Sequence, residues 1–247
     1  MKLSAMTKFE QLASSLQSTL SNNISESGFV GDEMILWNRM AHFQFDEEFM
    51  EAFNKEARHP TYRAMIYRAH TLVYFLRQII RKQIPGDCIE LGVFRGFKSK
   101  ILLNCCDSQL EDKKWFLLDT FTGIDEKLAS DSPIRNSEHN KPFLIDFIKH
   151  RFKKYDRVNI IHGSAPESVA KVTSKNFCFI HLDMNSATAE IASLELLWDS
   201  LSPGGCVILD DFGLSSHKAQ CLAHKKWFQL RGIHILELPT AQGIVIK

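Results

Sequence analysis

The chain of 247 residues is long enough for one α/β domain with an N-terminal extension, and a hydrophobic content of 45% can cover both faces of a central sheet. Thirty basic and 29 acidic residues give a formal net charge of +1, which removes the usual electrostatic basis for binding nucleic acid or an anionic membrane. A neutral or small ligand is therefore expected.

The six cysteines form no CxxC pair and no zinc-ligand spacing, so we interpret them as reduced and structural. Residues 1–17 lack a signal-peptide core, and no window reaches the apolar length that is needed to cross a bilayer. The sequence therefore predicts a cytoplasmic protein with no membrane partner.

Residues 1–60 show no strand alternation, and phenylalanines spaced as on a helix between Phe43 and Phe53 predict a helical N-terminal cap. This Phe-rich segment could equally serve contact with a second copy of the chain, which leaves a homo-oligomer open. Residues 61–82 alternate apolar side chains with arginines at helical spacing, and Pro85-Gly86 ends the pattern. We expect this helix to open the main domain, residues 61–247.

Strands and helices alternate from residue 88 onward. The predicted strands span 88–91, 115–118, 158–161, 177–182, 206–209, 233–238 and 243–247. The predicted helices span 97–106, 142–152, 167–172, 186–201 and 217–231. This alternation implies an α/β fold with a mostly parallel sheet and right-handed crossovers. Only residues 239–242 separate the last two strands, which must therefore be antiparallel neighbours.

A glycine-containing segment, Glu90-Leu-Gly-Val-Phe-Arg-Gly96, follows the first strand and opens a helix. Its glycines stand where the backbone must approach a ligand or turn sharply. Phe94 occupies the position of the middle glycine of GxGxxG, which would give a dinucleotide pyrophosphate poor access to the helix N-terminus. Glu90 suits a cationic amino-acid head group better than a diphosphate. A tight strand-to-helix turn without a ligand is the simpler alternative.

An acidic residue also ends the second strand. Asp119 could accept hydrogen bonds from both hydroxyls of a ribose, although a helix N-cap would use the same residue type. After the third strand, Gly163 and Ser164 could line an adenine pocket, and a loop turn explains them about as well. Glu90 and Asp119 together favour a nucleoside-containing cofactor.

Three further acidic side chains, Asp183, Asp210 and Asp211, follow two apolar runs that are typical of buried parallel strands. Carboxylates at the carboxyl ends of neighbouring strands point into the crevice where open α/β sheets bind ligands. Such a cluster would repel itself unless a cation or a shared proton lay among the oxygens. We therefore expect a divalent metal site that water and a substrate hydroxyl complete. A turn with one Asp as N-cap is the alternative for the pair 210–211.

Candidate catalytic groups surround this cluster. Asn185 and Ser186 begin a helix, and we interpret Ser186 as its N-cap. His217 follows the acidic pair and could act as a general base, although a solvated loop histidine is equally consistent with the sequence. The polar loop 125–141 has the composition of a mobile lid.

Four segments together resemble the macrocin O-methyltransferase family, and the resemblance extends over residues 60–247. The segments span 90–96, 118–124, 181–185 and 202–213. The resemblance implies a Rossmann-like class I methyltransferase fold, with a seven-stranded, mostly parallel sheet and an antiparallel last strand. It also implies methyl transfer from S-adenosylmethionine to a sugar hydroxyl of a small molecule, with Mg²⁺ as a further cofactor.

The same resemblance assigns roles to individual residues. Glu90, Gly92 and Gly96 would hold the amino-acid part of the cofactor and Asp119 its ribose, while Asp183, Asp210 and Asp211 would bind the metal. The remaining expected cofactor contacts are Val93, Phe94, Arg95, Ser99, Thr120, Phe121, Gly163 and Ser164.

One position departs from the family pattern. The resemblance implies an Asp-x-Asp motif at the fourth strand of the sugar methyltransferases in this family, and the second Asp of that motif is a candidate base. This chain has Asn185 at the position of the second Asp. Because an amide cannot take up a proton at neutral pH, the base must be another group, such as His217 or a lid residue, or the metal-bound alkoxide must form through water. Asp183, Asn185 and His217 are the candidate catalytic residues.

Two other functions remain open. A nicotinamide-dependent oxidoreductase would share the strand-end acids, but Phe94 and the antiparallel strand pair disfavour it. A non-catalytic ligand-binding protein on a methyltransferase fold is consistent with Asn185. The acceptor has no readable motif.

Overall fold

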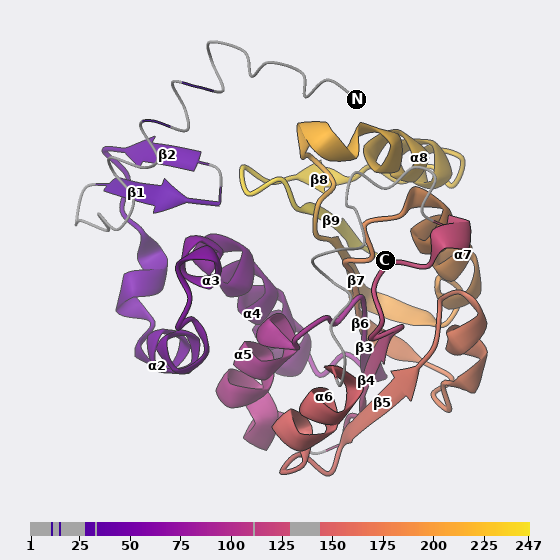
Figure 1. The fold of residues 1–247 in the computed structure, drawn as a ribbon. Coiled ribbons are helices and arrows are strands. Elements are labelled where there is room, and N and C mark those ends of the chain that lie inside the picture. Colours follow the sequence, from indigo (N-terminus) through magenta and orange to yellow (C-terminus); the bar gives the residue numbers. More distant parts are fainter. Residues whose placement is uncertain (1–10, 12–14, 16–27, 33, 111, 129–143) are drawn as a thin grey trace.

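The computed structural model describes residues 11, 15, 28–32, 34–110, 112–128 and 144–247. Its centre is a seven-stranded sheet with the order β5-β4-β3-β6-β7-β9-β8 (Figure 1). The strands of this sheet are β3 (Asp87–Leu91), β4 (Trp115–Asp119), β5 (Val158–His162), β6 (Phe177–Leu182), β7 (Leu201–Leu209), β8 (Leu236–Glu237) and β9 (Gly243–Ile246). β3 to β7 are parallel, and β9 runs antiparallel to both β7 and β8. This is the predicted sheet.

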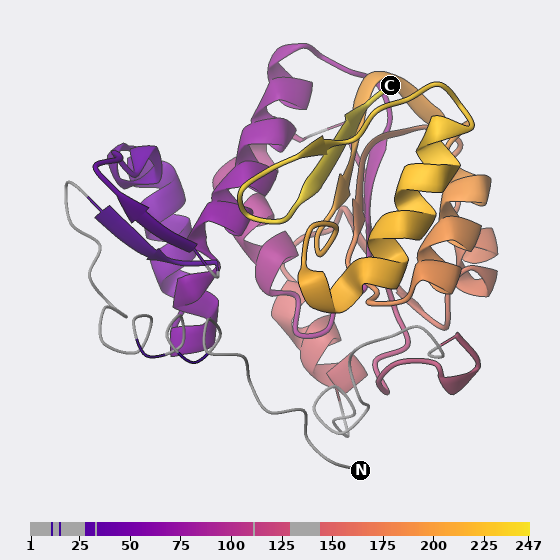
Figure 2. The same ribbon diagram turned by 90° about the horizontal axis from the view of Figure 1, so that it is seen from above.

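Helices cover both faces of the sheet (Figure 2). One face packs against α4 (Ile66–Arg81), α5 (Phe97–Cys106) and α6 (Leu144–Phe152), and the other against α7 (Ala187–Leu197) and α8 (Lys218–Gln229). Alternate residues of each strand enter the two cores, so that Cys88 faces the first group of helices and Ile89 the second. β6 is buried along its whole length, as a central parallel strand should be.

The N-terminal part contains more than the predicted helices. η1 (His42–Phe45) and α2 (Glu47–Glu56) are helical, but β1 (Gly28–Gly31) and β2 (Met34–Trp37) pair as an antiparallel hairpin (Figure 1). The expectation of no strand before residue 60 was therefore wrong. Four-residue strands are too short for a period of two to stand out, and packing of Phe29 against Tyr67 and Phe43 stabilises the hairpin instead.

Most predicted boundaries agree with the structure to within a few residues, with three clear differences. The predicted helix 61–82 is interrupted at Met65, which separates α3 (Pro60–Ala64) from α4. β7 begins at Leu201 rather than at 206, after a register shift against β6. The predicted strand 233–238 shortens to β8.

The short helices η2 (Asp107–Gln109), η3 (Glu126–Leu128), η4 (Glu167–Lys171) and η5 (Ser215–His217) complete the fold. Of the predicted lid, residues 125–128 are described, and 129–141 lie outside the described residues. No helix in the described part of the chain is long and apolar enough to cross a membrane.

Candidate functional site

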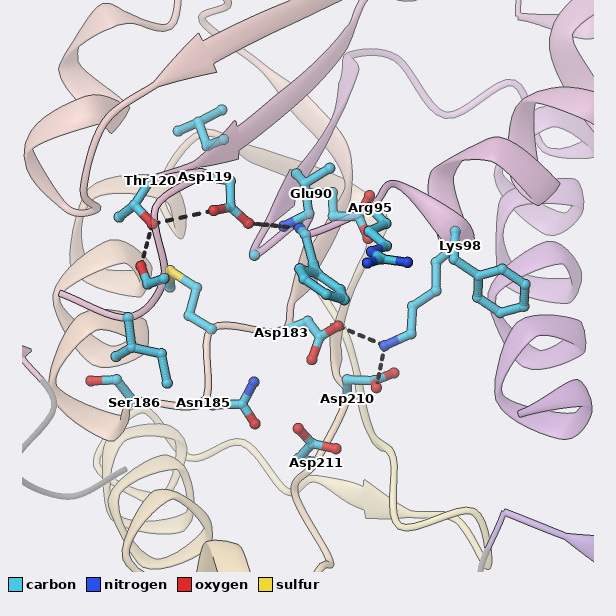
Figure 3. A pocket seen from close by; sticks show the side chains of 18 of the residues that line it. Glu90, Arg95, Lys98, Asp119, Thr120, Asp183, Asn185, Ser186, Asp210 and Asp211 are labelled. Atoms are coloured by element: carbon cyan, nitrogen blue, oxygen red, sulfur yellow. Dashed lines mark hydrogen bonds and ion pairs between the residues drawn. The ribbon is translucent and has the colours of Figure 1, made fainter. Parts of the chain in front are cut away.

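A cavity of about 740 Å³ opens at the carboxyl ends of β3, β4, β6 and β7, the edge at which α/β sheets bind ligands. The segment after β3, the loop after β4, the loop after β6 and the acidic pair after β7 line it, together with residues of α3 and α4. Figure 3 shows side chains from these segments turned toward one another. The volume is in the usual range for a small-molecule site.

Gly92 lets the ends of β3 and β6 lie side by side. Its φ is +89°, and a Cβ atom there would lie 2.0 Å from the carbonyl oxygen of Asp183. Only glycine combines this backbone conformation with that approach. The glycine that the sequence marked for a sharp turn is thus needed for strand packing as well as for access to the cavity.

Asp119 ties the segment after β3 to β4. Its Oδ2 accepts hydrogen bonds from the backbone N–H groups of Val93 and Phe94 at 2.6 and 2.7 Å. Its Oδ1 accepts another from Phe121 at 2.6 Å. Thr120 Oγ1 also lies 3.4 Å from Oδ1, but its single proton can go to the carbonyl of Gly123 instead, which leaves one of the about four acceptor sites of Asp119 for a ligand hydroxyl.

Glu90 is almost fully buried and belongs to a polar network beneath the cavity. It accepts a hydrogen bond from the Ser99 hydroxyl, which in turn accepts one from Trp115 Nε1 at 2.9 Å. Glu90 Oε1 lies 3.1 Å from His181 Nδ1, and His181 Nε2 lies 3.4 Å from Asp210 Oδ1. Burial opposes the charge of His181, but hydrogen bonds to Asp210 and Glu90 raise the pKa of this imidazole to about 9.

The three predicted acids do come together, and two basic side chains lie among them. Lys98 Nζ is 2.6 Å from Asp183 Oδ2 and 2.5 Å from Asp210 Oδ2 (Figure 3). Arg68 Nη1 donates to Asp210 Oδ2 at 3.0 Å and to Asp211 Oδ1 at 2.8 Å. Neither acid of the pair 210–211 caps a described helix, so their role is in this cluster.

The cluster shifts the pKa values of its members in opposite directions. Burial raises the pKa of Asp183 to about 8, against the attraction of Lys98. Burial acts on Asp210 too, but Lys98, Arg68 and His181 hold the pKa of Asp210 well below its ordinary value. The carboxylates in turn raise the pKa of Lys98 above that of a free lysine, despite its burial. Lys98 is therefore a fixed cation and Asp183 the group that can exchange a proton.

A divalent ion fits these residues poorly. His181, Asp183 and Asp210 have ligand atoms within 4.8 Å of one another, which is a metal-like grouping. The Lys98 ammonium, however, contacts both carboxylates of that grouping. An ion at the usual Mg²⁺–oxygen distance of about 2.1 Å would compete with the ammonium for the same oxygens. Asp211, the third predicted ligand, pairs with Arg68.

The structure brings Asn185 and His217 together. His217 Nε2 lies 2.8 Å from Asn185 Oδ1 and 3.6 Å from Asp211 Oδ2. Because an amide oxygen only accepts, Nε2 carries the proton in this arrangement. His217 is 6% exposed, so it is not a solvated loop residue. Ser186 is the N-cap of α7, as predicted, and accepts from the backbone N–H of Ala189.

Most of the predicted cofactor residues line the cavity. They are Glu90, Gly92, Val93, Phe94, Arg95, Asp119, Thr120, Gly163 and Ser164. Gly96, Ser99 and Phe121 are not among the lining residues. Gly96 is the left-handed N-cap of α5, Ser99 faces Glu90 and Trp115, and Phe121 is buried.

Sequence reasoning missed Lys98 and Arg68. Lys98 had a usable signal, because a lysine in the first turn of a helix is disfavoured by the helix dipole unless acids compensate it. Arg68 had none, since arginines recur along the amphipathic helix that contains it and only the fold shows which one is buried.

Comparisons with known proteins identify relatives of this chain. The sequence profile of the macrocin O-methyltransferase (TylF) family matches residues 21–235. The chain is 26% identical over 160 residues to the 8-demethyl-8-(2,3-dimethoxy-alpha-L-rhamnosyl)-tetracenomycin-C 4'-O-methyltransferase of Streptomyces olivaceus, which is 60% of this chain and 61% of that protein. It is 24% identical over 160 residues, or 59% of this chain, to the mycinamicin III 3''-O-methyltransferase of Micromonospora griseorubida. That alignment spans 62% of the relative, so the chain spans about three fifths of the curated relatives it matches.

Solved structures establish the fold. The O-methyltransferase NovP superposes with a TM-score of 0.63 and 19% identity over 74% of this chain and 80% of that chain. The calicheamicin methyltransferase CalS11 superposes with a TM-score of 0.61 and 15% identity over 98% of this chain and 93% of that chain. The fold is that of class I methyltransferases. On the match over residues 21–235, the chain belongs to the macrocin O-methyltransferase family.

Proposed function

We propose that this protein transfers a methyl group from S-adenosylmethionine to a hydroxyl of a sugar-containing small molecule. One observation carries the proposal: a single cavity joins the Gly92 turn and Asp119 to a buried cluster of charged groups around Asp183. The name of the Streptomyces olivaceus relative specifies a rhamnosyl group on its substrate, which supports a sugar acceptor. Family membership speaks against the nicotinamide alternative.

The cofactor site would use the residues between β3 and β4. Gly92 to Arg95 bring backbone into the cavity wall, and Asp119 presents a carboxylate that can accept from ribose hydroxyls. Thr120, Gly163 and Ser164 line the cavity near Asp119 and suit the adenine end. When bound, S-adenosylmethionine supplies an electrophilic methyl group.

The acceptor hydroxyl must lose a proton, and Asp183 is the residue we assign to take it. Its Oδ2 accepts from Lys98, and among the described residues its Oδ1 has no hydrogen-bond partner. Its pKa of about 8 is close to neutral pH, and a general base is most effective when its pKa lies near the pH at which the enzyme works. Asn185 is unable to take this proton, and His217 Nε2 already donates to Asn185. His217 would then orient Asn185 at the edge of the cavity.

Calorimetric titration with S-adenosylmethionine and S-adenosylhomocysteine tests the cofactor. Mass spectrometry after incubation with a panel of nucleotide-sugars and glycosylated natural products tests the transfer, with a gain of one methyl group expected. Failure to bind either cofactor would refute the proposal. Binding without a methylated product from the panel or from a metabolite extract would instead favour the non-catalytic ligand-binding protein that Asn185 had left open.

The rate should depend on pH through Asp183. Because the base must be deprotonated to act, kcat should rise as the pH increases through about 8 and level off above it. The measurement is a pH profile of kcat under saturating cofactor and acceptor. Asp183→Asn should remove this inflection from whatever rate remains. A wild-type profile that is flat between pH 6.5 and 9.5 would contradict the assignment.

A further inference from the structure

Lys98 lies at the centre of the candidate site and has no role in the sequence-based scheme. It follows the N-cap Gly96 by two residues on the first turn of α5, and its side chain is only 10% exposed. Figure 3 shows it extending from the helix to the point where Asp183 and Asp210 meet. Its ammonium contacts both carboxylates at 2.6 and 2.5 Å.

This position is energetically unfavourable for a lysine unless nearby carboxylates compensate its positive charge. Cations are disfavoured in the first turn of a helix, and a buried ammonium loses its hydration. Asp183 and Asp210 offset both effects, and Arg68 contacts the remaining acid, Asp211, as well as Asp210 and Asp32. Three carboxyl groups thus face the two basic side chains Lys98 and Arg68, and His181 also contacts Asp210. The cation that the acidic cluster requires is supplied by the chain itself.

A divalent ion and this ammonium exclude one another. The groups in the described part of the chain that could share an ion are His181, Asp183 and Asp210, and Lys98 contacts two of the three. A divalent ion bound to the same oxygens would lie within a few ångströms of the ammonium, where like charges repel by several kcal/mol even at an effective dielectric constant of about 20.

We propose that Lys98 replaces the divalent metal ion of this site. Its ammonium holds Asp183 and Asp210 in position and places a positive charge on the cavity wall, where the acceptor hydroxyl loses its proton. The first part of this inference, that Lys98 excludes a divalent ion, is independent of the proposed methyl transfer. The second part, that its ammonium assists the loss of the acceptor proton, rests on that proposed function. Two consequences follow: the wild-type protein works without a divalent metal ion, and removing the ammonium opens a site that binds one.

Binding of Mn²⁺ tests the first part without any assay of activity. The full chain is titrated with Mn²⁺, and the free ion is followed by electron paramagnetic resonance for wild type, Lys98→Ala and Lys98→Gln. Lys100→Ala is the matched control, because Lys100 lies on the same helix and donates to the carbonyl of Arg151 instead. Wild type and Lys100→Ala should bind at least about 100-fold more weakly than the Lys98 variants, which gain one site.

Lys98→Gln keeps the site testable if Lys98→Ala does not fold, because glutamine retains a hydrogen-bond donor without the charge. Thermal denaturation with and without Mn²⁺ gives a second readout, since an ion that binds only the folded state raises the melting temperature of the variants. Tight Mn²⁺ binding by wild type at the cluster would overturn the proposal. So would the absence of Mn²⁺ binding in a folded Lys98 variant.

Turnover tests the second part. Methyl transfer by wild type should be unchanged after EDTA treatment and dialysis, and added Mg²⁺ should have no effect. Loss of turnover in EDTA with recovery in Mg²⁺ would overturn the replacement of the metal by Lys98 while leaving the methyltransferase proposal intact. If no product forms under any condition, the proposed function fails, and the Mn²⁺ titration still decides whether Lys98 excludes a metal ion.

Discussion

Gly92→Ala should destabilise the protein by about 2–6 kcal/mol and remove measurable cofactor binding. The φ of Gly92 is +89°, a conformation that costs a residue with a side chain free energy at any site. The added Cβ would also lie 2.0 Å from the carbonyl oxygen and 2.5 Å from the carbonyl carbon of Asp183. Both are backbone atoms, so relief requires the ends of β3 and β6 to separate. Urea denaturation and calorimetric titration with S-adenosylmethionine measure the two effects.

Gly232→Ala separates backbone strain from the clash. Gly232 has a φ of +70°, and a Cβ there would meet nothing within 4 Å. This variant should therefore be destabilised only by the cost of the left-handed conformation, about 1–2 kcal/mol, and it should retain cofactor binding. Equal losses of stability in Gly92→Ala and Gly232→Ala would mean that the contact between β3 and β6 adjusts easily and does not constrain the cavity.

The sheet was predictable because its signals are local. The apolar run of β6 identified a buried strand, and the short connection 239–242 required β8 and β9 to be antiparallel neighbours. Ser186 identified the start of α7 by its capping chemistry. The hairpin of β1 and β2 had no comparable signal, because its stability comes from aromatic packing against α4, which begins nearly thirty residues later.

The site was predictable to the extent that it follows from topology. Parallel strands end at one edge of the sheet, so Asp183, Asp210 and Asp211 had to converge. What neutralises them was not predictable in this way, because Lys98 lies 85 residues from Asp183, and Arg68 lies 142 residues from Asp210. The sequence left open a cation or a shared proton among these carboxylates, and the structure places Lys98 and Arg68 there. The first-turn position of Lys98 was the one local signal that pointed to an ammonium.

Ser99 illustrates a second limit. The family resemblance placed it among the expected cofactor contacts, shortly after the glycine-containing segment along the chain. The helical rotation of α5 turns it inward, where it joins Glu90 to Trp115. Lys98, its neighbour, faces the cavity. The sequence therefore identifies the ligand-binding turn. The rotation of the helix that follows decides which of the nearby side chains reach the ligand.

Asp183→Asn should lower kcat by about 10²–10⁴-fold, the usual contribution of a general base, with little change in affinity for S-adenosylmethionine. Asparagine keeps the shape of the side chain and can still accept from Lys98, but it cannot take up the hydroxyl proton. Because the folded protein disfavours the charged form of Asp183, the urea midpoint should stay unchanged or rise. Asp146→Asn, the same change at an exposed position of α6, is the control for both measurements.

Two further variants decide where the proton goes. Asn185→Asp places a carboxylate next to His217 Nε2, which lies 2.8 Å from Asn185 Oδ1, at the position where the family resemblance implies the second Asp of an Asp-x-Asp. If Asp183 is the base, this change should not recover the activity that Asp183→Asn loses, because His217 Nε2 would donate its hydrogen bond to the new carboxylate. His217→Ala should then reduce kcat by less than Asp183→Asn does. Recovery in the double variant Asp183→Asn/Asn185→Asp, or a larger loss in His217→Ala, would move the proton acceptor to the pair formed by positions 185 and 217.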